Sequence, residues 1–196
     1  MISFSFITLI KRWPWGCLLL LLPACSGTKS KNNKPEDAAI LSYNYSLVDN
    51  TKKLIHNGDI IFRNGTDEVS RAARTMNRAD TSYSHCGLVF IENDTVFVYH
   101  ALGGSYNPSQ KLRRDPIDSF CTPKDHDRFA LYRYNMNNVM IEKLATTVSG
   151  YYKAGLRFDL YFNFFSDDKM YCSEFVFKSL NKAYGGSLNK YIRTDK

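Results

Sequence analysis

Cys172 stands where an aromatic stretch gives way to a helical pattern, in the segment KMYCSEFVFKSLNKAYGG. Counted from Cys172, small and apolar residues recur at the spacing of one helix face: Phe175, Val176, Ser179, Leu180 and Ala183. A thiol in the first helical turn meets the positive end of the helix dipole and free backbone N–H groups. These groups favour the thiolate and can hold an oxyanion. The pattern is therefore typical of a nucleophile, and a buried structural cysteine is the alternative.

A nucleophilic thiol needs a base, and two of the four histidines lie in one predicted hairpin, SHCGLVFIENDTVFVYHAL. Asn93 and Asp94 are typical of a two-residue turn, which places His100 opposite Gly87. Because side chains alternate along a strand, His85 and His100 then share one face of the sheet as diagonal neighbours. We therefore expect a cysteine–histidine pair in which the second histidine orients the first.

Cysteine and histidine are also zinc ligands, so a zinc ion held by Cys172, His85 and His100 is an alternative to this pair. The spacing of the three residues differs from the close ligand pairs of most zinc sites, and no fourth ligand is apparent. The sequence therefore favours a Cys–His pair that needs no metal and no organic cofactor.

The elements that must position these residues predict an α+β fold with an antiparallel sheet. Thr66 has the residue type of a helix N-cap and is expected to begin the second helix. Helices are expected over 36–56, 66–79, within 108–122, over 137–155 and after Cys172, and strands over 59–63, within 84–102 and over 128–134.

The first 24 residues have the pattern of a secretory signal peptide, with a charged start and a short apolar run that ends in small residues. That run is too short for a membrane span of about 20 residues. It ends in Leu-Pro-Ala-Cys, which resembles the lipobox of bacterial lipoproteins. We therefore expect lipid on Cys25, a polar tether over 25–39 and a folded domain over 40–196. A plain cleaved signal peptide with an unmodified Cys25 is the alternative.

The chain has a formal net charge of +7, which falls by two when the lysine and arginine of the signal peptide are removed. The positive residues that remain are spread along the domain without a basic block, so we expect no nucleic-acid partner. The lysines of the tether suit a position near anionic lipid headgroups.

Three cysteines, Cys86, Cys121 and Cys172, remain after processing, and an odd number in an exported protein indicates one free thiol. A disulfide between Cys86 and Cys121 is possible, but the spacing does not decide it. Because Cys86 follows His85 in a strand, its side chain is expected on the opposite face of the sheet, in the core.

Four ordered motifs resemble the YiiX-type permuted papain-like amidases: NGDIIFR, SYSHCGLVF, VFVYHA and LRFDLYFNFFSDDKMYCSEFV. These enzymes belong to the circularly permuted branch of the NlpC-type superfamily and are related to the lecithin retinol acyltransferase group. The resemblance covers residues 58–184. It implies a circularly permuted papain-like fold, with an antiparallel sheet packed against helices and the cysteine at a helix N-terminus.

By this resemblance Cys172 is the nucleophile and His85 is the general base. His100 falls where the family places its third polar residue, often a glutamate, and a histidine there is similar to the acyltransferase branch. Tyr171 and Asp159 match family positions near the site and are candidates for contacts with the substrate or the oxyanion.

The expected function is a cysteine hydrolase of the bacterial envelope that cleaves an amide bond in a peptide or a cell-wall peptide through an acyl-enzyme. The expected location is lipid-anchored and faces the periplasm. A hydrolase or transferase of fatty acyl groups with the same residues is an alternative, because Tyr161, Phe162, Phe164 and Phe165 could line a lipid pocket. A catalytically silent, ligand-binding lipoprotein is another.

Overall fold

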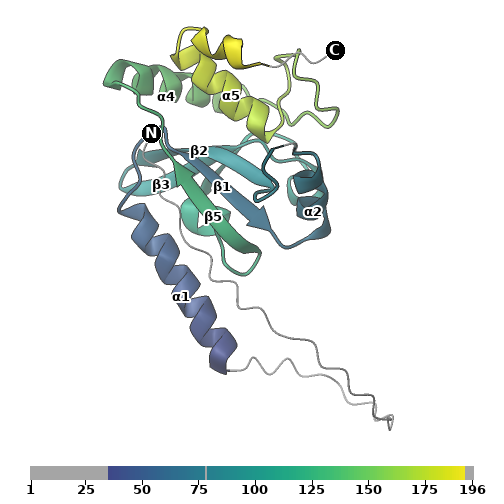
Figure 1. Cartoon of the computed structure of the whole chain (residues 1–196). Coiled ribbons are helices and arrows are strands. Elements are labelled where there is room, and N and C mark those ends of the chain that lie inside the picture. The colour runs from purple at the N-terminus through teal and green to yellow at the C-terminus, as the bar shows by residue number, and fades with distance from the viewer. Residues whose placement is uncertain (1–34, 78, 193–196) are drawn as a thin grey trace.

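A computed structural model of the protein describes residues 35–77 and 79–192. Its centre is one antiparallel sheet of five strands in the order β4-β3-β2-β1-β5 (Figure 1). The strands are β1 Ile60–Gly65, β2 His85–Glu92, β3 Thr95–His100, β4 Arg113–Pro116 and β5 His126–Tyr132.

Helices cover both faces of this sheet. They are α1 Pro35–Lys52, α2 Glu68–Thr75, α3 Ile117–Phe120, α4 Asn138–Lys153 and α5 Cys172–Ala183, with short 3₁₀ turns at Gly104–Tyr106 and Ser187–Tyr191. Figure 1 shows α4 and α5 packed together over one face, while α1 runs away from the other side of the sheet. The predicted α+β class with an antiparallel sheet is confirmed.

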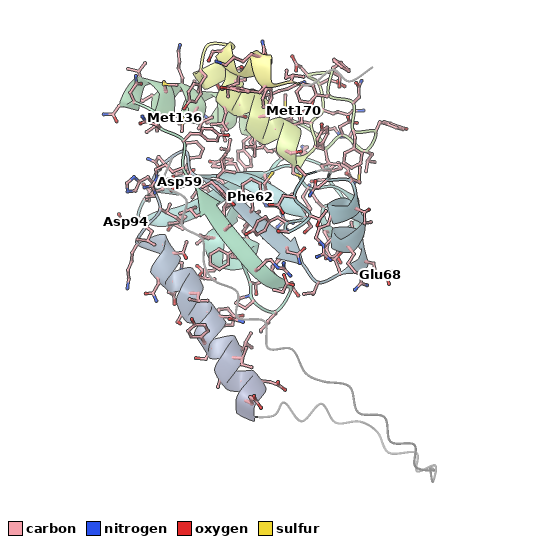
Figure 2. All side chains as sticks on the ribbon, in the orientation of Figure 1. Asp59, Phe62, Glu68, Asp94, Met136 and Met170 are labelled. Atoms are coloured by element: carbon pink, nitrogen blue, oxygen red, sulfur yellow. The ribbon has the colours of Figure 1, made fainter. Side chains whose placement is uncertain are left out.

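The hydrophobic core consists of two clusters, one on each face of the sheet. Along β2, Cys86, Leu88 and Phe90 belong to the cluster beneath α4 and α5, whereas Val89 belongs to the cluster that α1 and α3 cover. Met170, labelled in Figure 2, is fully buried in the first cluster and leads the chain into α5. The period-2 alternation of β2 therefore sends adjacent side chains to different layers of the molecule.

The predicted hairpin has the expected register. Glu92 pairs with Thr95, and Leu88 pairs with Tyr99, so the turn contains two residues, Asn93 and Asp94. Both turn residues have positive φ, at 46° and 61°. Asn and Asp tolerate this left-handed conformation, and a turn built from two such residues matches the twist of the flanking strands.

Three local expectations differ from the structure. Helix α2 is capped by Asp67 rather than Thr66, because the Asp67 carboxylate accepts the backbone N–H of Ser70. Helix α1 spans Pro35–Lys52, so it ends four residues before the end of the helix expected over 36–56. The segment after residue 108 contains a strand, β4, as well as the short helix α3.

None of the helices in the described part of the chain is long and apolar enough to cross a membrane. The expected signal peptide and the lipidation of Cys25 fall outside the described residues.

Candidate active site

Helix α5 starts at Cys172, and the preceding residue, Tyr171, has the extended conformation of an N-cap. The Glu174 carboxylate accepts the Tyr171 backbone N–H at 3.3 Å, which satisfies a donor at the helix start. The side chains that the sequence assigned to one helix face are all buried against the sheet: Phe175, Val176, Ser179, Leu180 and Ala183. Cys172 itself is partly exposed, so it lies at the edge of the core.

The two histidines of the hairpin meet as the register predicts. Nε2 of His85 lies 2.8 Å from Nδ1 of His100, and the two rings are nearly perpendicular. Gly87 makes room for this arrangement, because a Cβ at that position would lie 3.0 Å from the Cβ of His100 and 2.7 Å from the Tyr99 carbonyl oxygen. The hairpin thus brings together two residues that are adjacent only in the sheet.

Asp115 extends this pair into a chain, and sequence analysis missed it. Nε2 of His100 lies 3.0 Å from Oδ2 of Asp115. Arg113 donates to both oxygens of the same carboxylate, from Nε to Oδ2 at 2.8 Å and from Nη2 to Oδ1 at 2.9 Å. Although burial opposes it, the hydrogen bonds from His100 and Arg113 hold the pKa of Asp115 below its ordinary value. Asp115 therefore remains ionised and fixes His100.

The histidines lie in an apolar setting that keeps them neutral. His100 is fully buried, and the ring of Phe120 packs 5.0 Å from His100 and 5.7 Å from His85 between ring centroids. The guanidinium of Arg63 lies over the Phe120 ring, 4.3 Å from its centroid. Burial lowers the pKa of each histidine to about 4, and the Arg63 charge acts in the same direction. Neutral imidazoles can accept a proton at pH 7.

Two neighbouring side chains, those of His85 and Cys86, interact with the thiol of Cys172 and shift its pKa. The hydrogen bond from the Cys86 thiol lowers the pKa of Cys172. Burial opposes this effect, and the contact with His85 adds to it. The same contact, together with burial, raises the pKa of Cys86 well above its ordinary value. The pair therefore consists of a thiolate-prone Cys172 and a protonated Cys86.

The hydrogen bonds define where the protons lie along this chain. The Asp115 carboxylate can only accept, so Nε2 of His100 donates to it and Nδ1 of His100 is an acceptor. Nε2 of His85 then donates to that acceptor. The remaining nitrogen of His85, Nδ1, is left without a proton, and the His85 side chain contacts Cys172. The arrangement can therefore take a proton from the Cys172 thiol.

The two remaining candidates, Tyr171 and Asp159, make different contacts in the structure. The ring of Tyr171 packs 5.2 Å from that of Phe162, and burial raises the pKa of its hydroxyl, which therefore stays a donor. Asp159 is only 3% exposed, and its carboxylate accepts the backbone N–H groups of Tyr161 and Asn163. Asp159 thus shapes the loop before α5.

A sequence profile of the permuted papain-like amidases of the YaeF/YiiX type, the C92 family, matches residues 54–195. The chain belongs to this family. The uncharacterised protein YiiX of Escherichia coli K12 is 29% identical over 130 residues, which are 65% of this chain and 58% of YiiX. The match therefore spans less than two thirds of that relative.

A crystal structure of YiiX from Escherichia coli O157:H7 shares the fold, with a TM-score of 0.53 and 28% identity. The likeness covers 66% of this chain and 67% of that one. Family and structural likeness together confirm the permuted papain-like fold that the four sequence motifs implied.

The YiiX crystal structure is described as that of a metalloprotein, so the donors of this C92-family site need to be tested against a metal. Both ring nitrogens of His100 are engaged, one by His85 and the other by Asp115. The free nitrogen of His85 and the sulfurs of Cys172 and Cys86 remain, but Cys86 is held as a protonated thiol, whereas zinc binds thiolates. No group of three His, Cys, Asp or Glu side chains in the described ranges is arranged to hold a metal ion. The donor set does not fit a metal.

Proposed function

We propose that this C92-family protein is a cysteine hydrolase that cleaves amide bonds through an acyl-enzyme on Cys172. The observation that carries the proposal is the hydrogen-bonded chain from the Asp115 carboxylate through His100 to His85, with the Cys172 side chain next to His85. Such a chain fixes the tautomer of the base next to a nucleophile, which is the arrangement that cysteine and serine hydrolases use. Membership of an amidase family supports the same reaction class.

In the proposed reaction, Nδ1 of His85 accepts the proton of Cys172, and the sulfur attacks the carbonyl carbon of the substrate. The protonated His85 then donates this proton to the leaving nitrogen. Water attacks the thioester, His85 accepts its proton, and the acid product leaves as Cys172 is restored. His100 and Asp115 hold His85 in position and stabilise its transient positive charge.

The N-terminus of α5 supplies the second part of the proposed mechanism. The first backbone N–H groups of a helix have no partner within the helix, and the helix dipole adds positive potential there. A carbonyl oxygen that gains charge during attack by Cys172 lies near these groups. Tyr171 is the N-cap residue next to Cys172. We assign its side chain to shaping the pocket for this oxygen.

The test combines thiol reactivity with acyl-enzyme formation in the full chain. Iodoacetamide should label Cys172 rapidly below pH 7, faster than an ordinary thiol with a pKa near 8.5, and the label is located by peptide mapping. His85→Ala should remove this rapid labelling. With 4-nitrophenyl acetate, the wild-type chain should release a burst of nitrophenol and carry one acetyl group on Cys172, and Cys172→Ala should do neither.

Labelling of Cys172 at the rate of an ordinary thiol, unchanged in His85→Ala, would contradict the nucleophile assignment. The ligand-binding alternative would then become the better explanation, because it requires the fold but no activated thiol. Release of nitroaniline from peptide anilides, in the same variants, measures the amide specificity directly.

One observation favours fatty acyl substrates as a second candidate. The loop before α5 exposes several large apolar side chains: Leu160 at 59%, Tyr161 at 89%, Phe162 at 44% and Phe165 at 86%. Two anchors hold the loop. Asp159 binds its backbone, and Lys178 reaches the Ser166 carbonyl oxygen at 2.6 Å. A comparison of short and long acyl esters separates the two candidates, since an acyl site should favour the long chains.

We further propose that the protein is a lipoprotein of the bacterial envelope, attached through Cys25 and facing the periplasm. The support is the charged start, the short apolar run and the Leu-Pro-Ala-Cys exit of the sequence. Detergent partition of the full chain tests the anchor: Cys25→Ala should move the protein to the aqueous phase, and Cys17→Ala should not.

A further inference from the structure

Cys86 is a buried thiol that the proposed hydrolysis does not use. It is 4% exposed, and it belongs to the core cluster against which Cys172 packs. The strand alternation that turns His85 toward His100 turns Cys86 toward the layer of α4 and α5. The start of α5 therefore packs Cys172 against the cluster that contains Cys86, and the interaction between the two thiols lowers the pKa of Cys172.

The third cysteine of the domain lies elsewhere. Cys121 is buried in the opposite core cluster, beneath α1 and α3, so the sheet separates it from Cys86. Cys86, Cys121 and Cys172 are all free thiols in this structure. The disulfide that the sequence left open, Cys86–Cys121, is therefore not the pairing that the fold prepares.

The two adjacent thiols differ in the properties that peroxide chemistry requires. Cys172 is partly exposed and thiolate-prone, which makes it the sulfur that a small oxidant reaches first. Cys86 is buried and protonated, so it is protected from direct oxidation but lies within reach of its neighbour. Cys172 packs against the core cluster that contains Cys86, and a disulfide can form between cysteines whose Cα atoms lie within about 7 Å.

We propose that Cys86 is a resolving thiol, which forms a reversible disulfide with Cys172 when a peroxide oxidises the nucleophile. The Cys172 thiolate attacks one oxygen of hydrogen peroxide, becomes a sulfenic acid and releases hydroxide. The Cys86 sulfur then attacks the sulfenic sulfur, its proton joins the leaving hydroxyl, and water departs. The two sulfurs supply the two electrons that reduce the O–O bond, and a dithiol returns both cysteines to thiols.

The disulfide closes the site to hydrolysis while it protects the nucleophile. Without a neighbouring thiol, a sulfenic acid reacts further to sulfinic and sulfonic acids, which dithiols do not reverse. The inference depends on the reactivity of the Cys172 thiol, not on the bond that the protein hydrolyses. Its readout is therefore the mass of peptides, which stays informative if the protein cleaves no amide.

The experiment treats the reduced full chain with hydrogen peroxide near one equivalent, blocks remaining thiols and maps peptides without reduction. The expected product is a peptide pair joined through Cys86 and Cys172, which dithiothreitol separates. In Cys86→Ser, Cys172 should instead accumulate as sulfinic acid, and dithiothreitol should not restore its alkylation by iodoacetamide. Cys121→Ser, which removes a buried thiol from the other cluster, should behave like the wild-type chain.

Sulfinic acid on Cys172 of the wild-type chain, with no joined peptide pair, would overturn the proposal. So would equal recovery of Cys172 thiol in the Cys86→Ser and Cys121→Ser variants. If Cys86→Ser fails to fold by circular dichroism, Cys86→Val places an apolar side chain in the same cluster. The mapping of the wild-type chain decides the proposal without either variant.

Discussion

At the scale of single residues, the chain Asp115–His100–His85 must keep two imidazoles neutral while the carboxylate next to them stays ionised. Burial keeps both imidazoles neutral, with pKa values near 4, so that His85 can accept a proton at pH 7. The acceptor at the end of the chain, Asp115, is half-buried and must stay ionised, and the hydrogen bonds from His100 and Arg113 achieve this. The nitrogen that carries the proton in each histidine is then determined by the hydrogen-bond partner of that histidine.

Asp115→Asn tests this chain at its anchor. The asparagine amide can donate to Nε2 of His100, which would reverse both tautomers and leave a proton on the His85 nitrogen that faces Cys172. Correct acid–base catalysis contributes roughly 10²- to 10⁴-fold in rate, and we expect the burst from 4-nitrophenyl acetate to slow by a factor in this range.

Asp118→Asn is the matched control for that variant. Asp118 lies in the neighbouring helix α3, is mostly exposed and pairs with Lys52 at 2.6 Å rather than with a histidine. Its variant should keep the wild-type rate. Equal rates for the two variants, with intact circular dichroism spectra, would remove Asp115 from the proposed mechanism.

At the scale of elements, the β2–β3 hairpin and β4 carry the whole acid–base chain. The tight turn sets the register, Gly87 provides space for His100, and β4 pairs with β3 so that Val98 faces Asp115 and His100 faces Arg113. Helix α5 contributes Cys172 and its own N-terminus, from a layer packed over the sheet. The site therefore depends on the docking of one helix start against the end of one strand.

Gly87→Ala tests the role of the hairpin. The new Cβ would lie 2.6 Å from Cγ1 of Val98 and 2.7 Å from the backbone oxygen of Tyr99, so the strands must shift. We expect the free energy of unfolding to fall by about 1–3 kcal/mol, as for other overpacked core sites, and the Cys172 labelling rate to fall with it.

Gly150→Ala is a control that we expect to raise the free energy of unfolding rather than lower it. Gly150 lies within helix α4, and a Cβ there meets nothing within 4 Å. Alanine in a helix interior is favoured over glycine by about 0.5–1 kcal/mol. Urea titration should therefore show a small gain in stability for Gly150→Ala. A neutral result for Gly87→Ala in the same titration would show that the hairpin tolerates a side chain beneath His100.

At the scale of the whole molecule, the two histidines link the candidate active site to the stability of the fold. Their pKa values of about 4 in the folded protein lie below the value of about 6.5 expected when the chain unfolds. Between these values the unfolded chain binds more protons, so stability is fully present above pH 6.5 and is lost as the pH falls toward 4. Burial also lowers the pKa of His126, which acts in the same direction.

We therefore expect the free energy of unfolding to decrease between pH 6.5 and pH 4. One fully buried histidine, His100, accounts for about 3 kcal/mol of this loss at about 1.4 kcal/mol per pH unit. The contribution of His85 is smaller, because this side chain is partly exposed and solvent screens it. Urea titrations at pH 7, 5.5 and 4 measure the slope, and His100→Gln should reduce it. An unchanged slope in that variant would show that other groups control acid unfolding.

The sequence by itself determined the features of this protein that depend on neighbours along the chain. The helix periodicity after Cys172 identified its buried face, and the Asn93-Asp94 turn identified the register that joins His85 to His100. The family motifs led to the permuted papain-like fold, which the comparisons confirm. Turn and helix geometry are local, so a few residue types suffice to predict them.

Only the tertiary structure decided which distant groups complete the site. Asp115 lies on a four-residue strand rich in charge, with no alternation of polar and apolar residues to reveal it, and it reaches His100 because β4 pairs with β3. Cys86 meets Cys172 because two layers pack together. A carboxylate or a thiol has no local signature of its partner, since hydrogen bonds between layers depend on how the whole chain packs.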